Sequence, residues 1–428
     1  MHYPPPPPAP RLWRQRKIVA LALIGFASGL PLYLTRQTLQ AWMRTENIDL
    51  QTIGWFSLVA LPYSLKFLWA PVIDRYVPPF LGRRRGWLLI TQLALIIAIA
   101  AMSIQDPQRS LQLLAVNAIC IAFFSASQDI VADAYRSDVL SQREMGAGAA
   151  IFVLGYRVAL LATGAVAFFL ADRMPWPRVY FLLSALMVVG ILAVLFAPEP
   201  AGETPPRSFV EAVILPFLDF FQRRGVWQAL LVLLFIVLFK LPDALVLNMA
   251  TPFLIDLQFT QTDIGAIQGG VGILATIVGG IVAGSVVGRA GINRTLWIAG
   301  GLQAISNLAY YGLALAGMNY PAMVATIVTE NVCFGFAGTA FVAFLMSLCS
   351  IRFSATQYAL LSSLLGVSRD VLVAPTGAIP EATGWPRYFL ITVVAAIPGL
   401  LLLPLFAPWN RETPTVAADH PGETLDRG

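Results

Sequence analysis

Histidine is almost absent from this chain of 428 residues. His2 and His420 stand near its ends, so the rest offers no imidazole as general base, metal ligand or proton relay. Cys120, Cys333 and Cys349 fall singly within apolar runs, with neither metal-site spacing nor a disulfide framework. Any proton chemistry in the body of the chain must therefore use carboxylates, and we expect no cofactor and no metal.

Charged residues are also scarce. They make up 12% of the chain, against about 25% in soluble domains. Hydrophobic residues make up 57%, and the mean hydropathy is +0.72. The net charge of +5 does not indicate a nucleic-acid partner, because the basic residues lie between apolar runs rather than on one face. The composition predicts an all-α protein that spans a lipid bilayer many times.

Apolar runs long enough to cross a membrane recur along the whole chain. The predicted transmembrane helices cover residues 18–43, 53–73, 87–105, 111–135, 146–170, 177–197, 226–249, 263–287, 294–316, 320–349, 355–380 and 386–408. These are twelve segments, and an even number places both termini on the same side of the membrane.

The basic residues of the connecting segments indicate which side that is. One set of loops, together with the two ends, holds most of them: Arg11, Arg14, Arg16, Lys17, Arg75, Arg83, Arg84, Arg85, Arg136, Arg143, Arg207, Arg223, Arg224, Arg289, Arg294, Arg352, Arg411 and Arg427. The opposite loops hold only Arg44, Arg109, Arg173, Arg178 and Arg387. Since cytoplasmic loops are enriched in Lys and Arg, both termini are predicted to be cytoplasmic.

One linker divides the chain into halves of six helices each. It covers residues 199–225, where prolines precede FVEAVILPFLDFF, which reads as an amphipathic helix on the cytoplasmic interface. The predicted regions are a proline-rich tail, an N-terminal half, the linker, a C-terminal half and a second tail. Their bounds are 1–17, 18–198, 199–225, 226–408 and 409–428.

The two halves share a sequence pattern. Leu30-Pro31 precedes Ile53-Gly54 by the same offsets at which Leu241-Pro242 precedes Ile264-Gly265. Matching halves with a binding site at their interface are typical of secondary transporters. No Gly-rich phosphate loop or nucleophile elbow is present, so we expect a transporter and not an enzyme.

Several motifs carry a closer resemblance. The loop with Asp74, Arg75, Gly82, Arg83, Arg84 and Arg85 resembles the conformational-gate loop of the major facilitator superfamily, with four extra residues before the glycine. In the second half, Gly288 stands where the acidic residue would be. GFASGLPLYLTRQTLQAWM, GRRRGWLL, SASQDIV, GAGAAIFVLGYR and FSATQYALLS resemble the AmpG-type muropeptide permeases, and the similarity extends over residues 20–408.

This resemblance implies a major facilitator fold of twelve helices in the bacterial inner membrane, acting as a monomer. It also implies proton-driven import of GlcNAc-anhydroMurNAc, with or without its peptide, from the periplasm to the cytoplasm by alternating access. A link to β-lactamase induction, and hence to β-lactam resistance, follows from the same family. A symporter for another anionic cargo, such as a drug, siderophore or acyl-CoA compound, is the alternative. A membrane-embedded enzyme or a sensor fits the sequence less well.

Carboxylates inside the apolar segments are candidates for proton coupling, because ionisable groups at membrane depth usually mark proton or substrate paths. Asp129 and Asp133 are four residues apart and share one helix face, and Glu330 lies in the corresponding helix of the second half. The alternatives are structural. Asp129 could pair with Arg157, and Asp133 could brace basic loop residues. Glu330 could accept from neighbouring hydroxyls or from a cation in the segment 226–249 or 355–380.

Cations and amides inside the segments are candidates for binding an anionic sugar-peptide. The charged candidates are Arg36, Lys66, Arg157, Lys240, Asp243 and Arg369, and the amides are Gln37, Gln40, Gln128, Asn248 and Asn331. As alternatives, Lys240 could pair with Asp243 along one helix face, and Arg369 with the adjacent Asp370. Trp42, Trp55 and Trp69 could stack on sugars, although anchoring at the membrane interface is the favoured reading.

Overall fold

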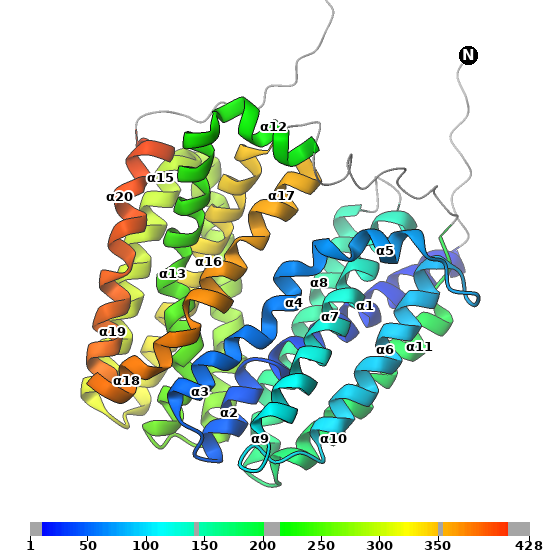
Figure 1. The fold of residues 1–428 in the computed structure, drawn as a ribbon, viewed down its shortest axis with the longest axis horizontal. Helices are drawn as coiled ribbons and strands as arrows, with labels where there is room; N and C mark the ends of the chain where they lie inside the picture. The colour runs from blue at the N-terminus through cyan, green and yellow to red at the C-terminus, as the bar shows by residue number, and fades with distance from the viewer. Residues whose placement is uncertain (1–10, 141–144, 201–214, 350–353, 410–428) are drawn as a thin grey trace, which may run out of the picture.

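The computed structural model describes residues 11–140, 145–200, 215–349 and 354–409, and over these ranges it consists of helices without strands. They form two bundles side by side (Figure 1), called here the N-bundle and the C-bundle. The N-bundle contains α1 (Arg11–Leu34), α2 (Gln37–Thr45), α3 (Leu50–Trp55), η1 (Phe56–Ala60), α4 (Leu61–Leu65), η2 (Lys66–Leu68), α5 (Ala70–Arg75), α6 (Arg83–Met102), α7 (Leu111–Val139), α8 (Met145–Leu161), η3 (Ala162–Val166), α9 (Ala167–Ala171), α10 (Trp176–Leu186) and α11 (Val188–Phe196).

The C-bundle follows the linker. It contains α12 (Leu215–Arg224), α13 (Val226–Asp256), α14 (Gln261–Ile264), η5 (Gly265–Val271), α15 (Gly272–Ala316), α16 (Tyr320–Leu348), α17 (Ser354–Ser363), η7 (Val367–Leu372), η8 (Ala374–Gly377), α18 (Ala378–Thr383), α19 (Trp385–Val394) and α20 (Ala396–Phe406). α1 begins at Arg11, before the predicted start at residue 18. Of the predicted tails 1–17 and 409–428, residues 1–10 and 410–428 lie outside the described residues, whereas residues 11–17 belong to α1.

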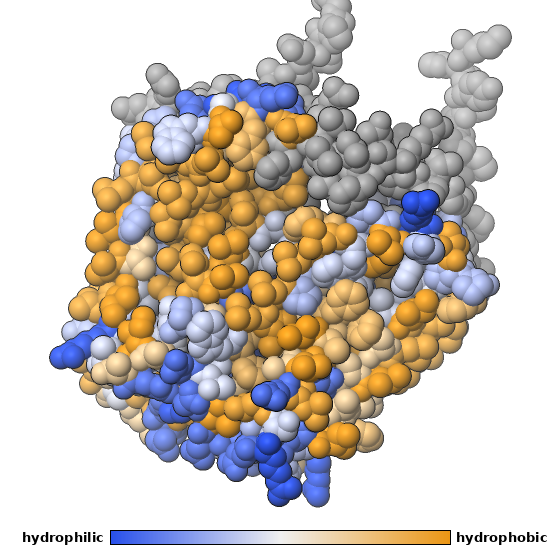
Figure 2. All heavy atoms as spheres, in the orientation of Figure 1, coloured by the Kyte–Doolittle hydropathy of each residue, from blue (hydrophilic) through white to orange (hydrophobic). Residues whose placement is uncertain are grey.

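The face of the molecule seen in Figure 2 is mostly apolar at mid-height and polar at its lower end. Large apolar side chains of several long helices are well exposed, for example Ile97 at 69%, Leu274 at 66% and Leu401 at 71%. A large contiguous apolar surface marks contact with a partner or a membrane. Together with the length of the helices, it defines a belt that faces lipid hydrocarbon.

Nine helices in the described ranges are long and apolar enough to cross a membrane, and they do not match the twelve predicted segments one for one. The predicted segment 53–73 is divided among α3, η1, α4, η2 and α5, and 355–380 among α17, η7, η8 and α18. The predicted segments 263–287 and 294–316 lie within one run of helix that bends at Gly291, where φ is +79°. The two divided segments and the merged pair account for the difference between the twelve predicted segments and the nine long helices.

The predicted amphipathic helix at 209–221 is described from Leu215 onward, as α12. It lies across one end of the C-bundle, beside α17 (Figure 1). Asp219 pairs with Arg223 at 2.8 Å and accepts a hydrogen bond from Gln357 Nε2, also at 2.8 Å. These contacts fix α12 to the end of α17. The end of the molecule that carries α12, α5 and the start of α17 is called the linker side below.

On the side opposite the linker, the bundles are joined by polar contacts. Arg44 of α2 pairs with Asp256 of α13 at 2.5 Å, and Asp256 also accepts a hydrogen bond from Trp385 Nε1 at 3.0 Å. α3 lies against η8 and α18, and η3 lies against η5. Toward the linker side, the ribbons of the two bundles diverge (Figure 1).

Two carboxylates strengthen this closure by capping a helix of the other bundle. Asp172, after α9, accepts hydrogen bonds from the backbone N–H groups of Gln261 and Thr262 at 3.1 and 2.6 Å. Glu381 of α18 accepts from the backbone N–H of Leu50 at 2.5 Å. The first N–H groups of a helix have no partner within it, so a carboxylate satisfies them and complements the helix dipole. Each bundle thus supplies one cap to the other.

Close packing of α15 on α16 depends on glycine. A Cβ added to Gly279 would clash with the backbone carbonyl of Val332, whereas one added to Gly284 would meet nothing. We therefore expect Gly279→Val to separate the two helices and to lower the free energy of unfolding by about 1–3 kcal/mol. Thermal unfolding of the purified protein in detergent would measure this loss. Gly284→Val is the matched control, and equal melting temperatures for the two variants would contradict the expectation.

The two bundles are closed on the side opposite the linker, and the caps favour this arrangement over one in which that side is open. Removing the reciprocal caps should therefore favour the open arrangement. In the double variant Asp172→Asn/Glu381→Gln, each lost cap costs about 1 kcal/mol, so the ratio of the two arrangements should shift roughly 30-fold. Distances between spin labels at Arg178 and Arg387, on the two bundles at that side, would report the shift in lipid membranes. The double variant Glu46→Gln/Asp106→Asn makes the same chemical changes within the N-bundle. Equal distance distributions in the two double variants would refute the role of the caps.

Candidate functional site

A cavity of ≈ 260 Å³ lies between the bundles, lined by residues of both. It brings together eight of the side chains proposed from sequence: Arg36, Gln37, Gln40, Arg157, Asn248, Glu330, Asn331 and Arg369. Residues that the sequence interpretation did not single out, among them Tyr33, Gln268, Thr276 and Phe334, complete the lining. The cavity therefore combines three guanidinium groups with amides, hydroxyls and aromatic rings.

Arg36 reaches the cavity from a break in the first helix. α1 ends at Leu34 and α2 begins at Gln37, and Arg36 between them has the non-helical angles φ −127° and ψ −105°. Pro31, within α1, removes a backbone donor just before the break. Broken helices are a feature of transporter binding sites, where irregular backbone can line a polar cavity. The apolar run 18–43 gave no sign of this break apart from the proline.

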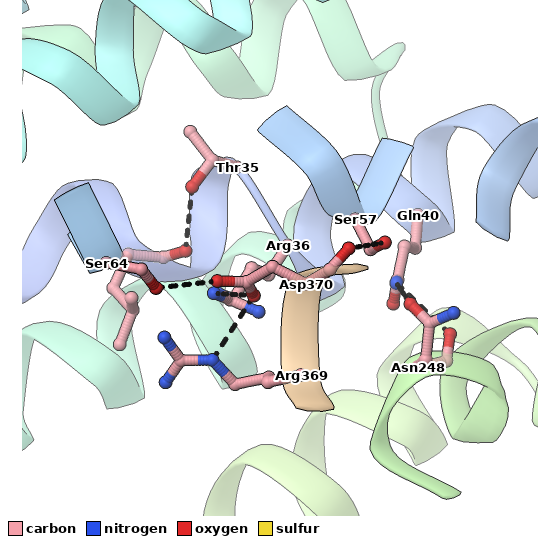
Figure 3. Close-up of polar contacts among 9 residues, drawn as sticks. Thr35, Arg36, Gln40, Ser57, Ser64, Asn248, Arg369 and Asp370 are labelled. Carbon is pink, nitrogen blue, oxygen red and sulfur yellow. Dashed lines mark hydrogen bonds and ion pairs between the residues drawn. The ribbon is translucent and has the colours of Figure 1, made fainter. Parts of the chain in front are cut away.

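Asp370 is a residue that sequence reasoning did not single out, since it entered only as a possible partner of Arg369. Its side chain is fully buried in the widened helical turn η7, between the bundles (Figure 3). Oδ1 accepts from Arg36 Nη2 at 2.8 Å and from Arg369 Nε at 3.3 Å, and Oδ2 accepts from Ser64 Oγ at 3.1 Å. The signal was present, since Asp370 is a carboxylate inside an apolar run like Asp129.

A second polar contact joins the bundles beside it (Figure 3). Gln40 Nε2 donates to the backbone carbonyl of Asn248 at 3.1 Å and lies 3.2 Å from Asn248 Oδ1. Asn248 Nδ2 in turn donates to the carbonyl of Val373 at 3.3 Å. Gln40 and Asn248 were proposed as hydrogen-bonding groups for a sugar, and the structure shows that they also bond to each other.

Arg157 differs from the other two arginines of the cavity. Within the described ranges it forms no ion pair, and the proposed alternative of a pair with Asp129 is not seen. It projects from α8 and lines both the cavity and an adjoining pocket with Phe152 and Tyr156. Arg157 is half-buried, and a charge that is partly removed from water is stabilised by a partner, so this unpaired guanidinium beside a cavity is suited to bind an anion.

Glu330 lies on the C-bundle side of the cavity and is 7% exposed. Its Oε2 accepts a hydrogen bond from Asn331 Nδ2 at 2.7 Å, and Thr276 Oγ1 donates to Asn331 Oδ1 at 3.0 Å. No cation within the described residues forms an ion pair with Glu330. Its carboxyl group is therefore free to exist in either protonation state without breaking an ion pair.

Asp129 and its neighbours lie outside the cavity, within the N-bundle. Asp129 interacts electrostatically with Lys66 and Asp133. Asp133 pairs with Arg136 at 3.2 Å, and 53% of its side chain is exposed. Gln128 is fully buried, with Ser28 Oγ at 3.4 Å from its Nε2. The structure thus separates these candidates from the residues that line the cavity.

Lys240 and Asp243 form the pair that their spacing on one helix face allowed. Nζ and Oδ2 are 3.0 Å apart, and the ammonium group lies 5.6 Å from the centre of the Phe341 ring. Neither residue lines the cavity. Trp42, Trp55 and Trp69 do not line it either: Trp42 is buried against Tyr180, Trp55 is 48% exposed, and Trp69 lies over Phe123.

The loop that the sequence predicts to be a conformational gate is held by contacts within the N-bundle. Arg84 pairs with Asp138 at 2.6 Å, and Arg83 approaches the same carboxylate at 3.8 Å. Glu199 accepts from the backbone N–H groups of Arg84 and Arg85 at 3.0 and 3.1 Å, at the start of α6. Gly82 precedes them with φ +79°, and Arg75 ends α5. The side chain of Asp74 lies outside the described part of the chain.

Two helical bundles with an apolar outer belt and a charged cavity between them define a polytopic membrane transporter. Residues 21–374 match the Major Facilitator Superfamily. The anhydromuropeptide permease of Escherichia coli strain K12 is 49% identical over 396 residues, which cover 92% of this chain and 80% of that protein. The putative transporter AmpG 4 of Rickettsia felis is 32% identical, with coverage of 92% and 97%. The chain belongs to the Major Facilitator Superfamily and, within it, to the AmpG-type anhydromuropeptide permeases.

Solved structures agree on the fold. A POT family transporter in complex with 5-aminolevulinic acid has a TM-score of 0.73 at 14% identity, with 92% of this chain and 97% of that chain covered. A D-xylose-proton symporter has a TM-score of 0.71 at 11% identity, with coverage of 94% and 99%. The predicted major facilitator fold and family are thus confirmed, and these relatives are transporters and not enzymes. The number of twelve helices and the bounds of the halves stay predictions.

Proposed function

We propose that this protein imports anhydromuropeptides, GlcNAc-anhydroMurNAc with or without peptide, from the periplasm to the cytoplasm, using the proton gradient. The main support is the 49% identity to a protein named anhydromuropeptide permease. The chemistry of the cavity agrees, since Arg36, Arg157 and Arg369 outnumber the carboxylates Glu330 and Asp370 beside them. Such a site favours a cargo with carboxylates, while Gln40 and Asn331 offer hydrogen bonds to its sugar and amide groups.

The proposed setting is the bacterial inner membrane, with both termini in the cytoplasm and the protein acting as a monomer. The halves 18–198 and 226–408 would rock about the cavity and open it alternately to each side. With the linker side facing the cytoplasm, the caps and the Arg44–Asp256 pair close the periplasmic side. The structure would then be in the state that faces the cytoplasm. The gate loop, held by Asp138 and Glu199 here, would change partners when the cytoplasmic side closes.

For proton coupling we propose Asp129 and Glu330 ahead of Asp133. A coupling carboxylate must gain and lose a proton as the carrier cycles, which is hindered when a cation holds it in the charged form. Asp133 is half exposed and paired with Arg136, whereas Asp129 and Glu330 are in no ion pair within the described ranges. Lys66, near Asp129, could respond to its charge.

The cargo and the coupling can be tested together by uptake of labelled GlcNAc-anhydroMurNAc-tripeptide into proteoliposomes, with and without an inward proton gradient. We expect the gradient to stimulate uptake by the wild-type protein. If Asp129 or Glu330 couples the proton, Asp129→Asn or Glu330→Gln should lose this stimulation and keep exchange of cargo without a gradient, because only the protonation step is removed. Asp106→Asn, in the loop before α7, is the control.

The outcomes separate the two parts of the proposal. Normal gradient stimulation in both variants would transfer the coupling role to Asp133. No uptake and no exchange by a well-folded wild-type protein would refute the muropeptide cargo and favour another anion.

Arg157 should contribute directly to affinity for the cargo. Arg157→Gln removes a charged donor worth about 1.5–3 kcal/mol when it binds a charged group, so we expect KM for uptake to rise about 10- to 100-fold. Arg157→Lys should recover only part of this loss, because lysine keeps the positive charge but cannot bind a carboxylate in the bidentate geometry of arginine. Arg178→Gln, at an exposed position on α10, is the control for the change in charge. An unchanged KM in Arg157→Gln would show that the cargo does not reach this side chain.

A further inference from the structure

The Asp370 carboxylate is a point at which the two bundles share a charge. Its oxygens are held by Arg36 and Ser64 of the N-bundle and by Arg369 of its own bundle (Figure 3). Its backbone carbonyl also accepts a hydrogen bond from Ser57 Oγ at 2.7 Å. Asp370 thus has more polar contacts across the bundle boundary than within the C-bundle.

Both guanidinium groups reach the cavity, and Asp370 does not line it. The side chains are 42% exposed for Arg369 and 19% for Arg36, against 0% for Asp370. An anion in the cavity would therefore contact the two arginines that pair with Asp370, without contacting Asp370 itself.

Arg36 uses only part of its donor capacity. A guanidinium group commonly binds a carboxylate through two parallel N–H groups, but Arg36 reaches Asp370 through Nη2 alone, and its buried Nε has no acceptor among the residues that the structure describes. The buried Oε1 of Gln40, in the same cavity, likewise has no partner in the described part of the chain. Because buried polar groups are nearly always hydrogen-bonded, these two atoms indicate where a ligand completes the site.

We propose that Asp370 is a positioning residue, an internal counter-anion that holds Arg36 and Arg369 in the empty carrier and competes with an anionic group of the cargo for both. This inference rests on the proposed function, in that the cargo is taken to be anionic. When the cargo carboxylate engages the two arginines, they bind Asp370 less strongly, and the contact between the bundles weakens. Occupancy of the cavity is thereby coupled to the movement of the bundles.

Competition predicts a gain of affinity on removal of the counter-anion. In Asp370→Asn, equilibrium binding of labelled GlcNAc-anhydroMurNAc-tripeptide to the full-length protein should be about tenfold tighter, while the turnover of uptake falls. Asp370→Glu, which keeps the charge, should return the affinity toward that of the wild type, and Asp106→Asn should leave it unchanged. A purely structural role for Asp370 would make binding weaker or leave it unaltered, and either result overturns the proposal.

A charge-neutral variant covers the case in which Asp370→Asn fails to fold. Arg36→Gln/Asp370→Asn removes both members of the ion pair and leaves the net charge of the group, then carried by Arg369, unchanged. Its comparison is Arg36→Gln, in which Asp370 still holds Arg369, so the double variant should bind the cargo about tenfold more tightly than Arg36→Gln. Equal affinity in these two variants would mean that Asp370 does not compete with the cargo, and the proposal would be wrong.

A measurement without cargo tests the role of Asp370 independently of which molecule the protein transports. Spin labels at Arg178 and Arg387 should show a broader distance distribution, extended to longer distances, in cargo-free Asp370→Asn than in the wild type. An unchanged distribution overturns the coupling, whatever the cargo is. If the wild-type protein binds no muropeptide but the distribution broadens in the variant, the cargo assignment fails and the role of Asp370 at the bundle boundary stands.

Discussion

The middle of this protein depends on one shared charge. Arg36 and Arg369 converge on the boundary between two bundles at membrane depth, where an unpaired charge is costly. The buried carboxylate of Asp370 pairs with both and offsets one of the two positive charges, and the hydroxyl of Ser64 satisfies its second oxygen. These partners come from both bundles. The interaction that lowers the cost of the arginine charges beside the cavity therefore also joins the two bundles, which must move relative to each other during transport.

The closure on the side opposite the linker also depends on carboxylates that bind groups of the other bundle, but here the donors are backbone N–H groups. Asp172 and Glu381 each occupy the start of a helix from the other bundle, where unsatisfied N–H groups point outward. These carboxylates lie near the surface, so water can replace their partners when the bundles part. This polar part of the closure is therefore reversible, as a carrier requires.

Charges within the helices fall into two groups. Lys240 with Asp243, and Arg136 with Asp133, are neutralised by a neighbour on the same helix and need no ligand. Arg157, Glu330 and Asp129 are in no such pair within the described ranges, and two of them line the cavity. An ion pair alone does not mark a structural residue, because Arg36 and Arg369 line the cavity although both pair with Asp370.

The sequence by itself determined the membrane setting, the all-helical class, the family and most of the polar groups that line the cavity, because composition, periodicity and motifs are local properties. It also offered the Lys240–Asp243 pair as an alternative to cargo binding, because the two residues are three apart on one helix face. Only the tertiary structure decided that Arg36 meets Asp370, 334 residues away, and that Asp129 lies apart from Arg157. It alone also divided the runs 53–73 and 355–380 into short helices and turns. Contacts between distant segments depend on how whole bundles pack, and no local pattern in the sequence specifies that.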